Sequence, residues 1–335
     1  MILSNNKVDD MTSSQRVPPI GGFGRFTAAA VLAAVWLAAP GLSNPARAAT
    51  LEVGTGKTYA MPSDAAAAAH AGDRIVIAAG TYFDCAVLRA SDLTIEGAGP
   101  EATVITDKAC AGKGLFIADG NNITIRNLTL TRARVPDTNG AGIRAEGGDL
   151  TVEHVQFVNN QNGILANDMP GKKVIVRDST FLRNGTCELG PCAHGIYAGH
   201  IGLLRVERSK FFETKQAHSI KSRAVRTEVI GCDIADGPNG TSSYPIEVPN
   251  GGDVVVRDNH IQKGPKSENH TAAVAIGAEG VTQPTPAIIV EHNTFLAEGD
   301  YNSYLVYNLT ATEAELKGNI LQGNAKPLRG DGVVN

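Results

Sequence analysis

The sequence predicts an all-β fold, a single-domain parallel β-helix with a short N-terminal capping helix. Two repeated patterns support this prediction. A stretch of alternating apolar and polar residues recurs every 23 to 34 residues, and a second short apolar segment follows each copy. A half-buried strand cannot cover its inner face alone, so the copies are expected to stack into a solenoid. The 37 glycines suit the many tight turns that such a fold needs.

Residues 1–48 are predicted to be a signal peptide. Arg16 and Arg25 precede the apolar run 26–39, and Ala46-Arg47-Ala48 offers the small side chains of a cleavage site. The run is too short for a comfortable membrane span. We therefore expect a periplasmic or secreted protein, cleaved near Ala48, whose mature chain has no membrane span.

The remaining boundaries follow from where the repeats begin and end. We expect an N-terminal cap and first coil over 49–92, parallel β-helix repeats over 93–325 and a C-terminal tail over 326–335. Without residues 1–48 the chain carries 26 basic and 32 acidic residues, a net charge of −6. This balance argues against a nucleic-acid partner.

Five cysteines remain in a chain that is expected to reach an oxidising compartment. Cys187 and Cys192 frame a short loop and are expected to form a local disulfide. Cys85 and Cys110 could form a second bridge. Cys232 would then be unpaired, and its place inside a repeat indicates a buried packing residue.

The first repeated strand has eight residues with alternating polarity, as a half-buried strand requires. Its copies span residues 123–130, 150–157, 174–181, 204–211, 227–234, 254–261, 288–295 and 314–321. A propeller or sandwich is the alternative, but it would need hairpin turn signals between the strands, and these are missing.

The second repeated strand is shorter, and the aliphatic residue at its centre is expected to face inward. Its copies are 142–144, 163–165, 195–197, 219–221, 245–247, 275–277 and 305–307. With two or three such strands per turn, the pattern describes a parallel β-helix.

The N-terminal end carries a cap signal. Ser63-Asp64 can cap a helix over Ala65 to Ala71, and the stretch 72–82 (GDRIVIAAGTY) then begins the solenoid. With this alanine-rich helix and its Gly-Asp…Gly-Thr-Tyr strand, the chain resembles the pectin-lyase-like superfamily over about residues 50–325. The resemblance implies a right-handed parallel β-helix and an exported protein that cleaves or epimerises an acidic polysaccharide, as a lyase-like enzyme.

Insertions cluster in the connection that precedes the second strand, so they are expected to form the wall of a groove beside that strand stack. The long connections are 132–140, 183–194, 235–244 and 262–273. Outward positions on the stack are predicted one residue after each central aliphatic: Arg144, Leu165, Tyr197, Lys221, Glu247, Gly277 and Tyr307. Two residues before it, His194, His218 and Tyr244 form another column.

The middle coils therefore gather seven candidate site residues: His194, Tyr197, His218, Lys221, Arg223, Tyr244 and Glu247. Elimination beside a uronate carboxylate needs a group that neutralises the carboxylate, a base and an acid. Arg223 fits the first role, because a guanidinium can bind a carboxylate with two bonds. Glu247 would hold Lys221 protonated, so a His/Tyr pair is favoured for proton transfer and Lys221 for electrostatic stabilisation.

Two alternatives remain open. Glu247 and Glu279 are predicted to lie on adjacent coils about 8 Å apart, within the range of an inverting glycoside hydrolase. The chain could instead be a non-catalytic glycan-binding or structural β-helix, with an aromatic platform at Tyr301, Tyr304 and Tyr307. A solvated surface of paired charges would also explain the ladder of Lys221 and Glu247.

No cofactor is predicted, and calcium remains possible because Asp233, Asp236 and Asp253 lie near the groove rim. Asn259, Asn293 and Asn319 occupy one repeat position and are interpreted as a stabilising ladder. The expected partner is an acidic polysaccharide, and the chain is expected to be a monomer. The polymer itself and the bond that is broken are left open by the sequence.

Overall fold

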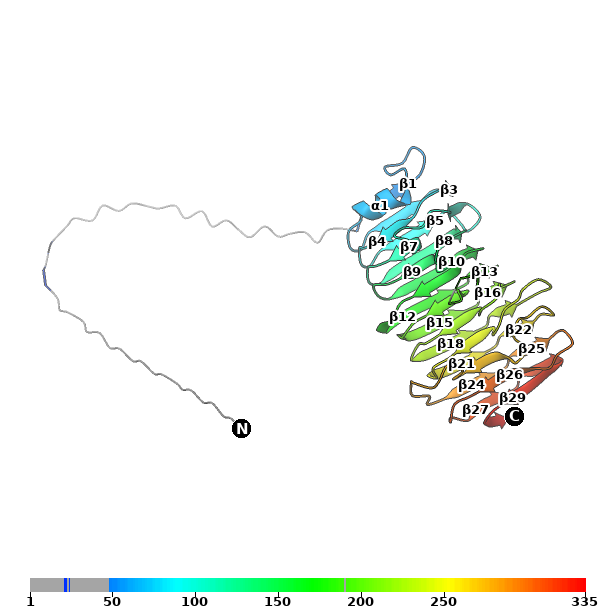
Figure 1. Cartoon of the computed structure of the whole chain (residues 1–335). Coiled ribbons are helices and arrows are strands. Elements are labelled where there is room, and N and C mark those ends of the chain that lie inside the picture. Colours follow the sequence, from blue (N-terminus) through cyan, green and yellow to red (C-terminus); the bar gives the residue numbers. More distant parts are fainter. Residues whose placement is uncertain (1–20, 23, 25–47, 190) are drawn as a thin grey trace, which may run out of the picture. The chain divides into compact units, whose positions relative to one another are not determined.

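The computed structural model describes residues 21, 22, 24, 48–189 and 191–335. The predicted signal peptide, 1–48, lies almost entirely outside these residues. From residue 48 onward the described chain is a parallel β-solenoid, in which each coil pairs with the coils before and after it (Figure 1). Its one described helix, α1 (Pro62–Ala68), lies at the N-terminal end.

The second repeated strands form a ten-stranded sheet of their own, ordered along the solenoid as they are in the sequence. Its strands are β4 (Ala86–Leu88), β7 (Gly114–Ala118), β9 (Ala141–Ala145), β11 (Asn162–Ala166), β14 (Ile196–Ala198), β17 (Ile220–Ser222), β20 (Ile246–Val248), β23 (Ala272–Ile276), β26 (Ser303–Asn308) and β29 (Ala325–Arg329). All neighbouring pairs are parallel, which confirms the predicted stack.

The first repeated strands form a 20-stranded sheet with two parallel runs. One run contains β1 (Thr50–Val53), β2 (Arg74–Ile77), β5 (Thr94–Gly97), β8 (Ile123–Thr131), β10 (Leu150–Val158), β12 (Met169–Arg177), β15 (Ile201–Glu207), β18 (Arg226–Ile230), β21 (Asp253–Arg257), β24 (Ile288–Glu291), β27 (Ala314–Lys317) and β30 (Gly332–Val334). The other contains β3 (Gly80–Tyr82), β6 (Thr103–Thr106), β13 (Thr180–Leu182), β16 (Lys210–Phe212), β19 (Asp233–Ala235), β22 (His260–Lys263), β25 (Thr294–Ala297) and β28 (Ile320–Gly323), with the second halves of β8 and β10.

Each predicted eight-residue strand bends at its fifth residue, which has a left-handed backbone. Asn127, His154, Asp178, Arg208, Asp258 and His292 have φ from 46° to 58°, and glycine takes the same place at Gly231 and Gly318. Asparagine, aspartate and histidine tolerate this conformation better than most residues do. The bend turns one predicted strand into two, so each full coil has three strands.

The coil interior is filled by stacked apolar side chains. Phe157, Phe181 and Phe211 stack with ring centroids 4.5 Å apart at each step. The asparagine ladder, Asn259, Asn293 and Asn319, lies in later coils, and in it each amide nitrogen donates to the next amide oxygen at 2.9 Å. The predicted ladder is thereby confirmed, and Cys232 lies buried without a disulfide partner, as expected.

The capping helix begins and ends about three residues earlier than predicted. Met61, not Ser63 or Asp64, is the residue before its first turn, and it makes no side-chain cap. Pro62 starts the helix, because proline fits the first turn, where its missing N–H is not needed. The helix packs on β1, β2 and β4 and buries Ala65 and Ala66.

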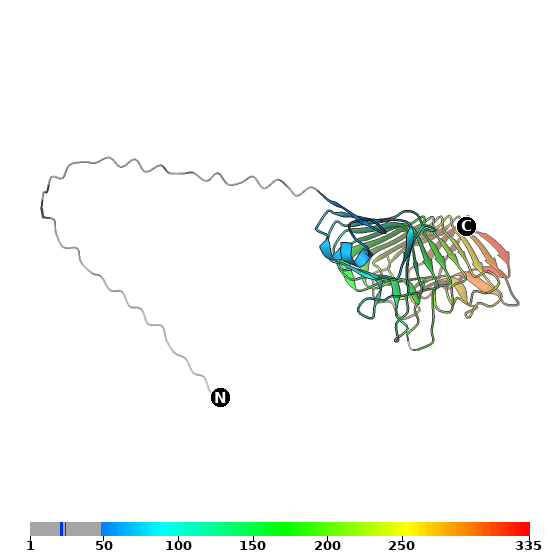
Figure 2. The same ribbon diagram turned by 90° about the horizontal axis from the view of Figure 1, so that it is seen from above.

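The last residues continue the stack where the sequence predicted a tail, since β29 pairs with β26 and β30 pairs with β27. Both expected disulfides are present, Cys85–Cys110 and Cys187–Cys192. In the view from above, long loops extend from one side of the solenoid (Figure 2). Within the described part of the chain, no helix is long and apolar enough to cross a membrane.

Candidate functional site

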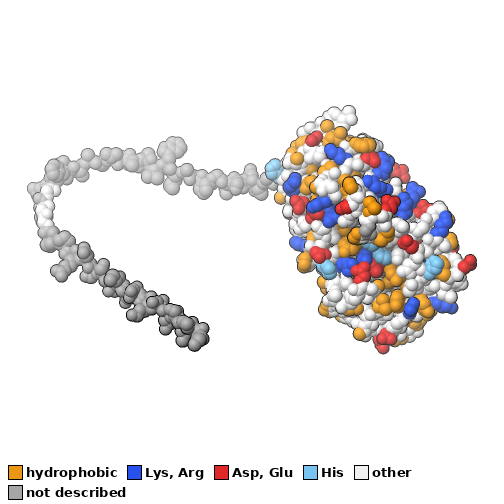
Figure 3. Space-filling view, viewed as in Figure 1, with side chains coloured by type: hydrophobic (Ala, Val, Ile, Leu, Met, Phe, Trp, Pro, Cys, Tyr) orange, Lys and Arg blue, Asp and Glu red, His pale blue; other side chains and the backbone are white. Residues whose placement is uncertain are grey.

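A cavity of about 800 Å³ lies over the middle of the ten-stranded sheet, on the outward side of β9, β11, β14 and β17. Its wall comes from two of the predicted long connections, through Asn139, Pro191 and Cys192. Basic, acidic and histidine side chains gather at the middle of the face seen in Figure 3. The residues that line the cavity include Arg144, Leu165, His194, Tyr197, His218, Lys221, Arg223 and Glu279.

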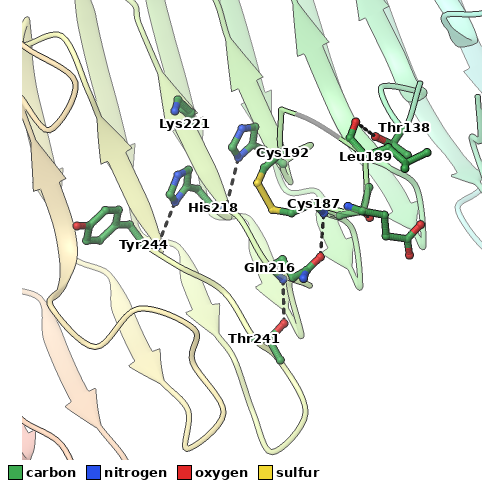
Figure 4. Close-up of a disulfide and its surroundings, with 12 residues drawn as sticks. Thr138, Cys187, Leu189, Cys192, Gln216, His218, Lys221, Thr241 and Tyr244 are labelled. Carbon is green, nitrogen blue, oxygen red and sulfur yellow. Dashed lines mark hydrogen bonds between the residues drawn. A yellow bond between two sulfur atoms is a disulfide. The ribbon is translucent and has the colours of Figure 1, made fainter. Parts of the chain in front are cut away.

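A histidine–tyrosine ladder formed by His194, His218 and Tyr244, one residue per coil, borders the cavity through its two histidines. Their rings stack with centroids 5.0 Å and 5.6 Å apart. Figure 4 shows His218 and Tyr244 beside the Cys187–Cys192 loop, with Lys221 near His218. The ladder predicted from the repeat is confirmed, although Tyr244 itself does not line the cavity.

Hydrogen bonds fix the ring nitrogens of both histidines. The backbone N–H of His218 donates to His194 Nδ1 at 3.2 Å, and that of Tyr244 donates to His218 Nδ1 at 3.1 Å. An acceptor nitrogen carries no proton, so the proton of each neutral ring is on Nε2. Burial, followed by the neighbouring His218, Lys221 and Arg223, holds the pKa of His194 well below its usual value. His194 is therefore a neutral ring that presents a hydrogen-bond donor.

Contacts within the protein occupy both ring nitrogens of His218, which the sequence favoured as a proton-transfer group. Its Nε2 lies 3.1 Å from Glu247 Oε2, and the same oxygen lies 2.9 Å from Lys221 Nζ. Burial alone would raise the pKa of Glu247, but His218 and Lys221 lower it to about 2. With one nitrogen bound to the backbone and the other facing an ionised carboxylate, His218 has no lone pair with which to take a proton.

Lys221 is held between two carboxylates. Besides Glu247, its Nζ binds Oε1 of Glu279, and Oε2 of Glu279 binds Arg223. The side chains of Lys221 and Arg223 are only 10% and 17% exposed, whereas that of Glu279 is 41% exposed. The two cations thus sit in the cavity floor, and Glu279 bridges them from the solvent side.

Arg223 also joins the cations to a phenol. Its Nε donates to Tyr197 Oη at 2.9 Å, and a second guanidinium nitrogen donates to Asn250. The Tyr197 oxygen is the acceptor in this bond, so its own proton is free to point into the cavity. No described residue accepts that proton. Tyr197 and His194, whose rings lie 5.6 Å apart, each have a donor that is free for a ligand.

The register of β23 differs from the one predicted. Ile246 pairs with Val274 and Glu247 with Ala275, so Ala275 takes the column position expected for Gly277. All five residues of β23 are buried and apolar, and such a run carries no alternation from which to set a register. Glu279 therefore lies beyond the strand, in a turn, and its side chain extends back over the cavity.

This arrangement does not fit an inverting hydrolase. One carboxyl of such a pair must be protonated to act as the acid, but the pKa of Glu247 is about 2. Burial would raise the pKa of Glu279, but Lys221 and Arg223 lower it. Both carboxylates bind one ammonium, so their nearest oxygens lie within about 6 Å of each other. The separation of about 8 Å predicted from the repeat referred to the Cα atoms, and from there the two side chains converge on Lys221.

The calcium candidates do not come together. Asp233 pairs with His260 at 3.1 Å, Asp236 accepts the backbone N–H of Gly264, and Asp253 pairs with Arg226. Among the residues that the structure describes, no group of three His, Cys, Asp or Glu side chains could hold a metal ion.

Sequence reasoning missed two polar contacts of the cavity. Asn162 accepts the backbone N–H of His194 at 2.7 Å. It lies two residues before Ile164, the same repeat position as His194, so the column rule would have found it. Asn250, which orients Arg223, lies in a loop after β20 and has no such signal.

Comparison with known proteins identifies the fold. No family model matches the chain, and no curated protein matches it. An alginate lyase from Paenibacillus sp. str. FPU-7 superposes with a TM-score of 0.54 at 18% identity, over 85% of this chain and 99% of that one. The A-module of mannuronan C-5 epimerase AlgE6 from Azotobacter vinelandii gives 0.50 at 16% identity, over 82% and 92%. At such identities the likeness shows the fold alone, and the chain has a right-handed parallel β-helix fold.

Proposed function

We propose that this protein is a polysaccharide lyase-like enzyme that removes the C5 proton of a uronate unit bound in the cavity. The observation that carries the proposal is the Arg223–Tyr197 pair beside Lys221, which puts a guanidinium, a phenol and an ammonium group around one cavity. Two proteins with the same fold act, by their names, on alginate and mannuronan.

The cations would act on the uronate carboxylate. Neutralising that group stabilises the charge that develops when the neighbouring C5 proton leaves. Arg223 and Lys221 lie in the cavity floor. Arg144, on β9, lines another part of the same cavity. A guanidinium binds a carboxylate with directed bonds, so Arg223 also orients the ring.

Tyr197 is the group that we assign to proton transfer. His218 has both nitrogens engaged, and Lys221 is an ammonium between two carboxylates. Tyr197 first gives its phenolic proton to solvent in the open cavity, and the Nε–H of Arg223 stabilises the resulting phenolate. The phenolate then takes the proton from C5; the electron pair forms the C4=C5 double bond, and the C4–O4 bond breaks. The same phenol then returns the proton to the leaving O4. His194 donates a hydrogen bond from Nε2 to the sugar.

Epimerisation shares the first half of this sequence. It would differ in that Tyr197 keeps the proton it has taken while a proton from solvent is added to C5 from the opposite face, with no broken glycosidic bond. The two reactions are therefore separated by product and not by the residues that start them.

The test is turnover of a panel of uronate polymers, including alginate, mannuronan and polygalacturonate, by the wild type and by Tyr197→Phe. Ultraviolet absorbance reports unsaturated ends, and proton NMR reports epimerised units. We expect the variant to lose at least about 100-fold in rate. Tyr307→Phe is the matched control, because Tyr307 faces outward on β26 and its ring packs under Arg329 without touching the cavity.

Full activity in Tyr197→Phe would contradict the assigned role. No product by either readout from any of the polymers would contradict the enzyme proposal and leave a glycan-binding or structural β-helix as the better interpretation.

A further inference from the structure

The two cations in the cavity floor are already bound to a carboxylate, and it belongs to the protein. Glu279 places one oxygen on Lys221 and the other on Arg223. A uronate carboxylate has the same planar shape and the same pair of acceptor oxygens. The contacts that Glu279 makes are thus those that the anionic group of a ligand would make.

A ligand carboxylate can replace Glu279 more easily than Glu247, the other carboxylate at this site. The side chain of Glu247 is 5% exposed and lies beneath Lys221, whereas that of Glu279 is 41% exposed. An ion pair in which one partner remains open to water is weaker than a fully buried one, because water replaces the contacts that the exposed partner loses. Releasing Glu279 into solvent therefore costs far less than releasing Glu247.

The exchange needs a side-chain rotation only. The backbone N–H of Glu279 donates to Pro249 O at 3.1 Å, and the next carbonyl, Gly280 O, accepts from Asn250 Nδ2 at 3.0 Å. These bonds fix the turn after β23 on the loop after β20. Rotating the Glu279 side chain away from the cations leaves them intact.

Charge counting defines the ligand class. With Glu279 in place, Lys221, Arg223, Glu247 and Glu279 sum to zero. When Glu279 turns away, Lys221, Arg223 and Glu247 leave one positive charge, and a single carboxylate neutralises it. A neutral sugar would leave that charge uncompensated among groups that are mostly out of water, which is unfavourable.

We propose that Glu279 occupies the subsite for the ligand's carboxylate, so that binding exchanges one carboxylate for another and selects acidic over neutral glycans. This inference rests on the proposed function for the identity of the ligand, but the anion exchange itself does not. Glu279 is thus a specificity residue that competes with the ligand and takes no part in the reaction.

The experiment is a titration of the full-length wild type, Glu279→Gln and the control Glu298→Gln with sodium acetate at constant ionic strength, followed by NMR. Acetate is the smallest carboxylate, so the result does not depend on knowing the polymer. Glutamine keeps the size of Glu279 and removes its charge. We expect acetate to bind Glu279→Gln about tenfold more tightly than wild type, equal to about 1.4 kcal/mol. Glu298 is exposed and outside the cavity, so its variant should match wild type.

Unchanged or weaker acetate binding in Glu279→Gln, in a protein with wild-type thermal unfolding, would overturn the inference. The double variant Lys221→Met/Glu279→Gln should lose the gain, which ties it to the cation pair. Tighter acetate binding without turnover of any uronate polymer would defeat the proposed function and keep the exchange. Turnover of a uronate polymer without tighter acetate binding would keep the proposed function and defeat the exchange.

Discussion

Two ladders of stacked polar side chains run along this solenoid, and they differ in how completely the stack engages them. In the asparagine ladder, Asn293 accepts from the backbone and the amide of Asn259, and donates to Val256 O and to Asn319. In the histidine–tyrosine ladder, each histidine accepts one backbone N–H from the next coil through Nδ1. Its second nitrogen is not used by the stack.

The difference lies in the chemistry of the side chains. An amide has a donor and an acceptor on one carbon, so both can face neighbouring coils. An imidazole has its two nitrogens on opposite sides of the ring, so when one contacts the stack the other points away. Nε2 of His218 faces Glu247, and no described residue bonds to Nε2 of His194. The histidine–tyrosine ladder, whose Nε2 atoms are not used in the stack, is thus the ladder that borders the cavity.

The asparagine ladder should be the more costly of the two to break. Asn293→Ala removes the acceptor of the Asn259 backbone N–H and the donor to Val256 O, both inside a coil where water cannot replace them. Because each buried group left unpaired costs about 1 to 3 kcal/mol, we expect the free energy of unfolding to fall by about 4 kcal/mol in urea titrations. Ligand binding by the folded fraction should not change.

Asn319→Ala is the graded control, because Asn319 is less buried and ends the ladder. A loss at Asn293 no greater than that at Asn319 would contradict the view that the ladder acts through its buried bonds.

The carboxylate that holds the histidine–tyrosine ladder gives the second largest effect. The pKa of Glu247 is about 2 in the folded chain against 4.5 in the reference state, so its ionised form stabilises the fold above pH 4.5. This contribution is lost as the pH falls from 4.5 toward 2. We expect Glu247→Gln to lower the free energy of unfolding at pH 7 by about 3 kcal/mol and to flatten its acid dependence in that window.

The matched control is Glu315→Gln, which changes an exposed glutamate on β27 and should leave the acid dependence as in wild type. An unchanged slope below pH 4.5 in Glu247→Gln would mean that Glu247 is not the group that titrates there.

The fold and the histidine–tyrosine ladder could be predicted because both depend on repetition. The spacing of the apolar residues fixes which positions stack, and Tyr197, Lys221 and Glu247 pair as the repeat indicates. The same reasoning failed at β23, where five apolar residues give no alternation and the register slipped by two.

The remaining features of the site depend on side chains that leave the repeat. Glu279 extends back from a turn across two coils, and the loop residue Asn250 orients Arg223. The protonated nitrogen of His218 is set by a backbone N–H of the next coil. No residue type or spacing encodes such contacts, so the sequence could name the candidates but not which of them are free to act.

The smallest effect tests whether His194 is a neutral donor. Burial lowers the pKa of His194 in the folded chain well below 6.5. Below pH 6.5 the unfolded chain therefore binds a proton at His194 that the folded chain does not bind. Stability should therefore fall as the pH drops below 6.5, by up to about 1.4 kcal/mol per unit. His194→Phe keeps a stacked ring and removes the titration, so its unfolding free energy should be about 1 kcal/mol lower at pH 7, from the unpaired N–H of His218, but nearly flat from pH 6.5 to 5. Parallel pH curves for wild type and variant would show instead that another group, and not a buried neutral His194, titrates in this window.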